Sequence, residues 1–127
     1  MLLFLDLDEV LRLHASRIER YGGAEGLRDR ALLESAIGMP SLSFAGEYHH
    51  SDVAQMAAAY LFHLVSNHPF VDGNKRTGLA AALIFLEMNN VDLIVDEEAE
   101  IELTIRVAEG KASKEEVAAY FRAHIRD

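Results

Sequence analysis

The residues best suited to chemistry in this chain lie together between positions 68 and 77. The stretch reads His-Pro-Phe-Val-Asp-Gly-Asn-Lys-Arg-Thr. It contains an imidazole at His68, a carboxylate at Asp72 and two cations at Lys75 and Arg76, arranged around a glycine turn just before an apolar helical segment. Each of these groups has a physical role if the ligand is a nucleotide phosphate.

His68 is the candidate general base. A histidine side chain ordinarily titrates near neutral pH, so it can accept a proton from a hydroxyl and release it again. An isolated histidine at a helix end is more often structural than catalytic, but the neighbours of His68 favour catalysis. Asp72 is open to two interpretations as well. Aspartate before glycine is a common turn pair, whereas a carboxylate beside phosphates can hold Mg²⁺, and we expect Asp72 to be a metal ligand.

A turn and the start of a helix are expected around these side chains. Pro69 lacks a backbone N–H and disfavours helical geometry at the residue before it, so a helix should end at His68. Gly73 can adopt a positive φ, and Asn74 can then cap the next helix, which should run to about Asn89. Because the first N–H groups of a helix are free and carry a positive dipole, we expect Gly73 and Asn74 to help bind phosphate.

Lys75 and Arg76 stand where stability alone would favour acidic residues. Cations at a helix N-terminus oppose the helix dipole and cost about 0.3–1 kcal/mol each. Their placement is explained if an anion occupies the turn, since lysine offers a point charge and arginine a flat fork of donors. The alternative for Arg76 is an ion pair with an internal carboxylate such as Glu87 or Asp52.

The same residues resemble the motif of the Fic/Doc superfamily. Its nucleotidyl-transferring Fic branch reads His-x-Phe-x-(Asp/Glu)-Gly-Asn-Gly-Arg-x-x-Arg, and its Doc branch reads His-x-Phe-x-Asp-x-Asn-Lys-Arg-Thr. The chain departs from the Fic pattern at Lys75 and Leu79, as the Doc branch does. The resemblance extends to Arg-Tyr-Gly-Gly at 20–23 and to Leu-Ile-Phe-Leu at 83–86, and so covers most of the chain.

The resemblance to the Doc branch implies a toxin of a toxin–antitoxin pair. Such a protein would transfer the γ-phosphate of Mg-ATP to a Ser or Thr of another protein, elongation factor Tu, and a Phd-like antitoxin would fold its tail against it. The implied cofactors are ATP and Mg²⁺. The implied site consists of His68 as base, Asp72 as metal ligand, and phosphate contacts from Gly73, Asn74, Lys75 and Arg76.

Two other functions are compatible with the sequence. One is AMP transfer to a protein hydroxyl, as in the Fic branch, although Lys75 and Leu79 both argue against it. The other is a non-catalytic helical binding module that keeps the motif only as a structural turn. The self-inhibitory pattern of Fic proteins, (Ser/Thr)-x-x-x-Glu-(Gly/Asn), is approached at Ser43 and Glu47 but fails at Tyr48. Control by a separate antitoxin is therefore the expectation.

The composition is that of an ordinary globular chain with an acidic balance. The chain has 127 residues, half of them apolar, and a net charge of −9. These values predict one domain over residues 1–127 and argue against nucleic acid as the main partner. There is no cysteine, so neither a disulfide nor a thiolate zinc site can form. Acids follow the apolar start at once, and no apolar run reaches the ~20 residues of a membrane span, so we expect no signal peptide, no membrane partner and a cytoplasmic setting.

Helical periodicity nearly throughout predicts an all-α fold, a compact single-domain bundle of about six helices. The first four expected helices cover residues 8–21, 29–37, 51–67 and 74–89. Two more should follow, the last opened by a capping box of Ser113 and Glu116. Between the helices, residues 41–50 should form a loop or flap, and residues 91–95 a brief extended piece.

The remaining side chains of interest are expected to be structural. Phe70 should pack inward and anchor the loop. Four other histidines lack the His-Asp or Glu-x-x-His pairing typical of a metal site, so we interpret them as surface or core residues. They are His14, His49, His50 and His63.

Overall fold

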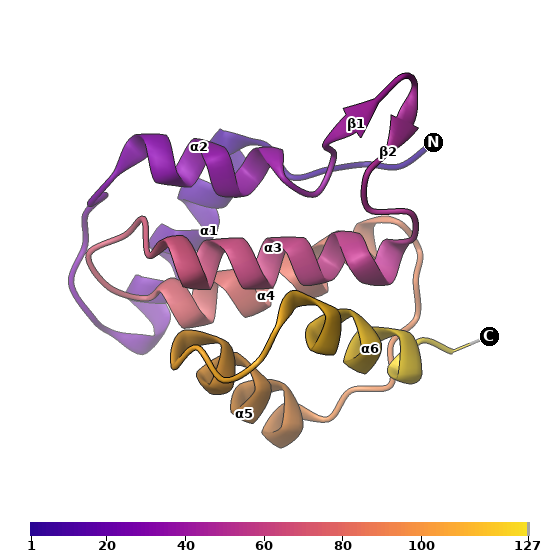
Figure 1. Cartoon of the computed structure of the whole chain (residues 1–127). Helices are drawn as coiled ribbons and strands as arrows, with labels where there is room; N and C mark the ends of the chain where they lie inside the picture. The colour runs from indigo at the N-terminus through magenta and orange to yellow at the C-terminus, as the bar shows by residue number, and fades with distance from the viewer. Residues whose placement is uncertain (127) are drawn as a thin grey trace.

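The computed structural model describes residues 1–126, which form six α-helices and one small β-hairpin (Figure 1). The helices are α1 (Leu7–Tyr21), α2 (Arg30–Gly38), α3 (Val53–Asn67), α4 (Asn74–Met88), α5 (Glu97–Ala108) and α6 (Lys114–His124). The expected all-α fold is confirmed, and the observed boundaries of the first four helices lie within two residues of the expected ones. Among the described residues, none of the helices combines the length and apolar content needed to cross a membrane.

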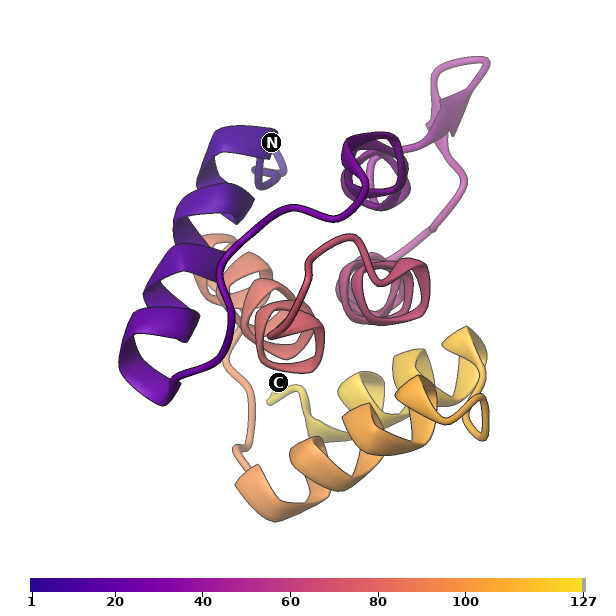
Figure 2. The ribbon, with the colours of Figure 1, turned by 90° about the vertical axis from the view of Figure 1, so that its left-hand side faces the viewer.

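Helix α3 is the centre of the bundle. It packs most extensively against α4 and α6, and α2 and α5 also contact it. Figure 2 shows α3 nearly end-on, with α2 above it, α4 at its side and the α5–α6 pair below. The close contact with α4 depends on Gly78. A Cβ atom at this position would lie 2.8 Å from Val65 Cγ2 and 3.2 Å from the Leu61 carbonyl oxygen, so the two backbones approach more closely than a side chain would allow.

Side-chain caps fix where most helices begin. Five N-cap side chains accept a hydrogen bond from the backbone N–H three residues on. These caps are Asp6, Asp29, Asp52, Asp96 and Ser113. The capping box expected at α6 is only half formed, because the Glu116 carboxylate pairs with Arg106 at 3.1 Å instead of with the Ser113 backbone. A complete capping box is present at α1, between Asp6 and Glu9.

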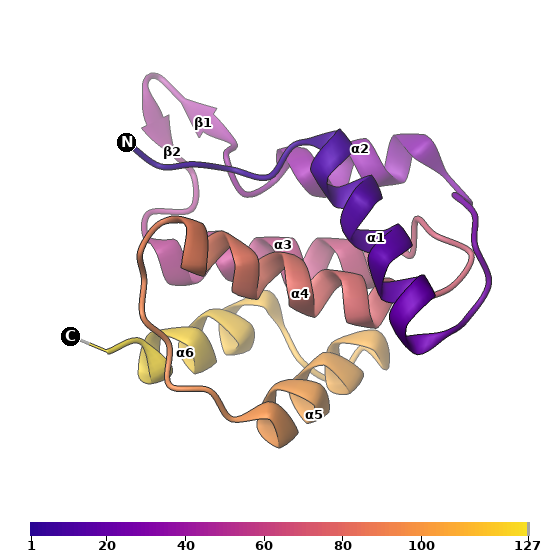
Figure 3. The ribbon, with the colours of Figure 1, turned by 180° about the vertical axis from the view of Figure 1, so that it is seen from behind.

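The 41–50 segment, expected to be a loop or flap, contains a short β-hairpin. Strands β1 (Ser43–Phe44) and β2 (Glu47–Tyr48) are antiparallel, joined by Ala45 and Gly46 with φ of 50° and 82°. Positive φ at both turn residues is typical of two-residue hairpins. Figures 1 and 3 place this hairpin near the start of α3, at the opposite end of the bundle from the α3–α4 loop. Strands of two residues are too short to produce an alternating sequence pattern, so the sequence did not indicate them.

Two extended segments fasten the chain ends to the bundle. The Leu5 backbone N–H donates to the hydroxyl of the fully buried Tyr60, at 2.8 Å. The expected extended piece at 91–95 contains Leu93, which forms an isolated antiparallel bridge with Ile125. The N-terminal segment is thus tied to α3, and the C-terminal segment to the stretch between α4 and α5.

Candidate functional site

The α3–α4 loop brings the predicted site residues together at one end of the bundle. Helix α3 ends before Pro69, as expected, and His68 follows it in a left-handed conformation with φ of 50°. Helix α4 begins after Gly73, whose φ is 79°. The His68 side chain is exposed and shares a pocket of about 150 Å³ with Val65 and Ala108. The other residues that line this pocket are Asp72, Gly73, Asn74, Lys75 and Arg76.

Backbone donors hold the Asp72 carboxylate in place. Its Oδ2 accepts a hydrogen bond from the Ala24 N–H at 3.2 Å, and its Oδ1 accepts one from the Gly73 N–H at 2.8 Å. These two bonds, together with the nearby charges of Arg76 and Lys75, lower the pKa of Asp72. The exposed carboxylate is therefore ionised at neutral pH, and each oxygen keeps a lone pair that a hard cation such as Mg²⁺ can use.

Asn74 does not cap α4, contrary to the expectation from the sequence. The N-cap residue is Gly73, and no side chain caps this helix. The Asn74 side chain is buried and turns back to the loop, where Oδ1 accepts from the Phe70 N–H at 2.9 Å and Nδ2 donates to the Phe70 carbonyl at 3.0 Å. Because the Phe70 backbone occupies both ends of the amide, any contact of Asn74 with an anion would come from its backbone.

Lys75 and Arg76 have no acidic partner among the residues that the structure describes. Lys75 is exposed. Asp52, one alternative partner considered for Arg76, pairs with Arg122 at 2.9 Å. The Arg76 guanidinium instead lies over the Tyr21 ring, 5.7 Å from its centroid. Both cations at the first turn of α4 are therefore available to an anion.

The surroundings of Tyr21 add further positive charge next to the pocket. The guanidinium groups of Arg17 and Arg20 also lie over the Tyr21 ring, 5.6 and 5.5 Å from its centroid. Arg76 and Arg17 also line a second, mainly apolar cavity of about 460 Å³ between α1, α4 and α5. Three arginines around one ring favour the approach of negatively charged ligands to this end of the bundle.

A segment from another part of the chain braces the loop backbone. We call residues 22–29, which connect α1 to α2, the strap; Figure 2 shows it crossing the side of the bundle on which the α3–α4 loop lies. The Val71 N–H donates to the Gly26 carbonyl at 3.0 Å. The Pro69 carbonyl accepts two strap N–H groups, at 2.7 and 2.9 Å, the shorter bond coming from Arg28.

The Arg28 side chain caps the C-terminal end of α3, a role that the sequence did not predict. Its Nε donates to the His68 carbonyl at 2.7 Å, and its Nη2 donates to the Asn67 carbonyl at 3.0 Å. The last carbonyls of a helix lack partners within the helix, and an arginine satisfies them while complementing the helix dipole. No local signal marks this role, because the partners are backbone atoms 39 and 40 residues along the chain.

The inner side of the loop rests on His14, which is buried as a core residue. Its Nε2 lies 2.7 Å from the Asp72 carbonyl oxygen and must carry the proton, because a carbonyl can only accept. Its ring stacks on Phe70 at 3.7 Å with an angle of 4° between the planes. Phe70 is 1% exposed, so its expected inward packing is confirmed. Gly23 completes the support, because a Cβ there would lie 2.7 Å from Asp72 Oδ2.

Comparison with known proteins agrees with this fold and loop. The model of the Fic/DOC family matches residues 4–86. The chain is 36% identical over 115 residues to "Protein kinase doc" of Escherichia phage P1, covering 91% of this chain and 90% of that protein. It is 41% identical over 93 residues to "Toxin Doc" of Mycolicibacterium smegmatis, covering 73% of this chain and 69% of that protein. The chain therefore belongs to the Fic/DOC family, within its Doc branch.

Proposed function

We propose that this protein is the toxin of a toxin–antitoxin pair and transfers the γ-phosphate of Mg-ATP to a Ser or Thr hydroxyl of another protein. The observation that carries the proposal is the exposed His68 in the same pocket as the ionised Asp72 and the cationic first turn of α4. The relatives named as a protein kinase and as a toxin support the same class of function.

The reaction requires one proton transfer and one phosphoryl transfer. As the target hydroxyl oxygen bonds to the γ-phosphorus, its proton passes to the imidazole of His68. The bond from the γ-phosphorus to the bridging oxygen breaks, and ADP leaves with that electron pair. The free N–H groups of the first turn of α4, with Lys75 and Arg76, stabilise the phosphate charge. Asp72 would hold Mg²⁺, which offsets the negative charge of the phosphates.

The proposed target is elongation factor Tu, and the proposed regulator is a Phd-like antitoxin. Both follow from the resemblance to the Doc branch, and the relative named as a toxin supports the toxin class. His68 and Val71 are exposed at the mouth of the loop, which leaves room for a hydroxyl carried by a macromolecule. The net charge of −9 suits a protein that meets a basic partner surface.

A transfer assay with ATP labelled either at the α or at the γ position tests the reaction. Purified elongation factor Tu, Mg²⁺ and this protein should give labelled factor from γ-labelled ATP only. The His68→Ala variant should reduce the rate by about 10²–10⁴-fold while keeping its helical circular dichroism. The control is His124→Gln at the C-terminal end of α6, on the opposite side of the bundle from the α3–α4 loop, which should transfer normally.

Each alternative gives a different result. Label retained from the α position alone would establish AMP transfer and overturn the kinase proposal. A non-catalytic module would show no transfer and no ATP-dependent thermal shift. Expression of this protein alone should stop bacterial growth, and the His68→Ala variant should relieve the arrest. Full tolerance of the active protein at high level would contradict the toxin proposal.

A further inference from the structure

His14 contacts the α3–α4 loop from α1 but does not line the pocket around His68. Figure 3 shows α1 crossing the end of α4 at which this loop lies. The His14 side chain is 6% exposed and touches the loop on either side of Val71. Its ring stacks on Phe70, and its Nε2–H donates to the Asp72 carbonyl. His14 therefore acts on the loop itself and not on a ligand in the pocket.

The Asp72 carbonyl and the Gly73 N–H belong to one planar peptide unit. In a trans unit these two groups point in opposite directions, so the donor that fixes the carbonyl also fixes the direction of the N–H. The carbonyl accepts from His14 at 2.7 Å, and the N–H donates to Asp72 Oδ1 at 2.8 Å. Among residues 1–126, only His14 donates a hydrogen bond to this carbonyl. The orientation of the peptide unit that holds the Asp72 carboxylate thus depends on His14.

Gly73 itself does little to select one orientation of this peptide unit. Its φ is 79°, and glycine tolerates backbone conformations that other residues avoid. A Cβ on Gly73 would lie 3.0 Å from Ile18 Cδ1 and 3.5 Å from His14 Nε2, so two α1 side chains lie against the backbone of the turn. If the peptide unit rotated away from His14, the Gly73 N–H would leave the Asp72 carboxylate. Of its two backbone donors, only the Ala24 N–H at 3.2 Å would then remain.

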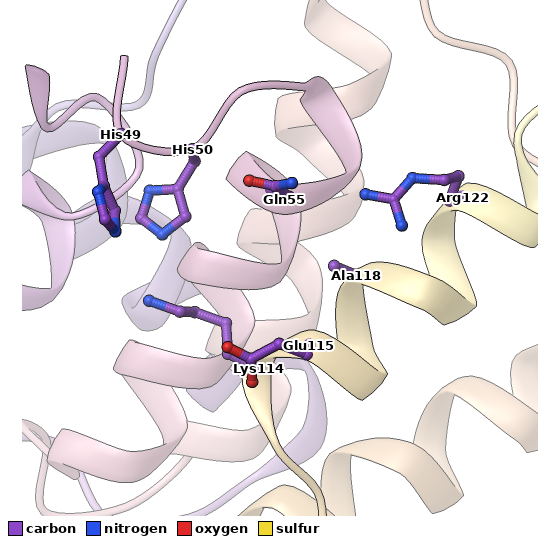
Figure 4. Close-up of a pocket in the computed structure, with 7 residues that line it drawn as sticks. All are labelled: His49, His50, Gln55, Lys114, Glu115, Ala118 and Arg122. Atoms are coloured by element: carbon purple, nitrogen blue, oxygen red, sulfur yellow. The ribbon is translucent and has the colours of Figure 1, made fainter.

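Other histidines outside the loop have different surroundings. Figure 4 shows His49 and His50 at a pocket between the start of α3 and helix α6, and this pocket shares no lining residue with the pocket of the α3–α4 loop. His63 Nε2 lies 3.1 Å from the Nζ of Lys114 on α6. Among the histidines outside the loop in the described part of the chain, only His14 forms a hydrogen bond with a loop atom.

We propose that His14 is a positioning residue that holds the Asp72 carboxylate in the orientation needed to bind Mg²⁺ during phosphate transfer. The inference rests on the proposed function, in which Asp72 is the metal ligand. Groups that orient a metal ligand without touching the metal contribute about 10–100-fold to metal affinity or activity. The His14 bond reaches the main chain of Asp72 and not its carboxylate, so we expect an effect at the lower end of that range.

Substitutions of His14 separate its hydrogen bond from its stacking on Phe70. His14→Phe keeps a ring against Phe70 but has no donor. His14→Gln loses the ring but carries an amide N–H at a similar reach from the backbone as Nε2. The positioning role predicts that His14→Gln performs better than His14→Phe, whereas a role in packing alone predicts the reverse. If His14→Phe does not fold, His14→Asn replaces it, because its amide is one methylene shorter and does not reach the carbonyl.

The first readout requires neither metal nor nucleotide. Amide hydrogen exchange, followed by ¹H–¹⁵N nuclear magnetic resonance, reports on the Ala24 and Gly73 N–H groups that hold the Asp72 carboxylate. In His14→Phe both amides should exchange about tenfold faster relative to the Leu61 amide inside α3, and in His14→Gln by less than about threefold. Unchanged exchange of the Gly73 amide in His14→Phe would overturn the proposal.

The second readout is the Mg²⁺ dependence of transfer from γ-labelled ATP. In His14→Phe the Mg²⁺ concentration that gives half the maximal rate should rise by about tenfold. The rate at saturating Mg²⁺ should fall by less than about threefold, because His68 and the cations of α4 are unchanged. His14→Gln should restore most of the Mg²⁺ affinity. A lower Mg²⁺ requirement in His14→Phe than in His14→Gln would show that the ring matters only through packing.

Val10→Ala is the matched control for a loss of stability in α1. Val10 is fully buried and lies one turn before His14 on the same helix. This substitution should lower the urea midpoint because it leaves a cavity, but it should not change the Mg²⁺ dependence or the exchange of the Gly73 amide. An equal rise in Mg²⁺ requirement in Val10→Ala and His14→Phe would attribute the effect to a general loosening of α1 and overturn the positioning role.

Failure of this inference can be distinguished from failure of the proposed function. If the unmodified protein transfers the γ-phosphate and His14→Phe shows the same Mg²⁺ dependence, the positioning role is refuted and the transfer reaction stands. If the unmodified protein transfers no phosphate to its target, the proposed function and the positioning role are both refuted.

Discussion

Replacing Arg28 with alanine should loosen the α3–α4 loop although no residue that lines the His68 pocket is replaced. Two hydrogen bonds from its guanidinium, at 2.7 and 3.0 Å, satisfy the carbonyls of His68 and Asn67. The backbone bonds from the strap to Pro69 remain in the variant, so the substitution removes the side-chain contribution alone. Comparing this variant with the unmodified protein therefore measures how much the two Arg28 side-chain hydrogen bonds contribute to stability and to the position of His68.

The expected loss of stability is about 1–2 kcal/mol. A hydrogen bond to a charged group contributes about 1.5–3 kcal/mol, but Arg28 is exposed and water can replace its bonds, so each bond should contribute about 0.5–1 kcal/mol. Arg30, also exposed, forms only an i,i+4 ion pair with Glu34 at 2.9 Å on the surface of α2. Arg30→Ala should cost less than about 0.5 kcal/mol and is the matched control.

Urea unfolding monitored by circular dichroism measures the stability of Arg28→Ala and Arg30→Ala, and the labelled-ATP assay measures their transfer rates. The left-handed conformation of His68 is unfavourable for a residue with a side chain, so the freed carbonyl should let His68 relax. We expect Arg28→Ala to lower transfer by roughly tenfold, equivalent to about 1.4 kcal/mol, with partial recovery in Arg28→Lys. Equal unfolding midpoints for Arg28→Ala and Arg30→Ala, or an unchanged transfer rate, would refute the role given to Arg28.

Two predictions concern the scaffold. Gly78→Ala should destabilise the protein by about 1–2 kcal/mol in urea unfolding, because overpacking against Val65 and Leu61 outweighs a gain of up to about 1 kcal/mol in helix propensity. Gly38→Ala, where the new Cβ meets open space, should be neutral or stabilising, and an equal loss in both variants would contradict this reason. His63→Gln should flatten the dependence of stability on pH. The folded-state pKa of His63 is lowered to about 4 from 6.5, so its contribution is complete above pH 6.5 and is lost as the pH falls toward 4, with a slope of at most about 1.4 kcal/mol per pH unit. If the free energy of unfolding changes by the same amount between pH 7 and pH 5 in this variant and in the unmodified protein, His63 is not responsible for the pH dependence.

The helices could be predicted from the sequence because their signals are local. Asp29 and Asp52 stand immediately before the apolar periodicity of α2 and α3. Pro69 disfavours a helical conformation at His68, the residue at which α3 ends. These residues act on backbone atoms within four positions, so the sequence contains all the information that is needed. The hairpin lacked such a signal, because its turn is Ala45-Gly46 rather than one of the common asparagine–glycine or aspartate–glycine pairs.

The residues of the candidate site were also predictable, but the support that positions them was not. His68, Asp72 and the cations of α4 fall within one short stretch and converge as expected on one pocket. The error at Asn74 shows where local reasoning fails. Asparagine before a helix is usually a cap, but here the Phe70 backbone lies within reach of both ends of the amide and outcompetes the helix N–H groups.

The geometry of His68 explains why the loop needs partners from elsewhere. Pro69 prevents α3 from continuing, and the left-handed turn at His68 brings an exposed imidazole to the pocket at a cost in backbone energy. Partners outside the loop help to offset this cost, since the carbonyls of His68 and Pro69 both bond to the strap. Changes in the strap should therefore alter the proposed transfer without replacing any group that is proposed to meet the nucleotide. The residues of the candidate site lie within ten consecutive positions, but their geometry depends on a segment about forty residues away.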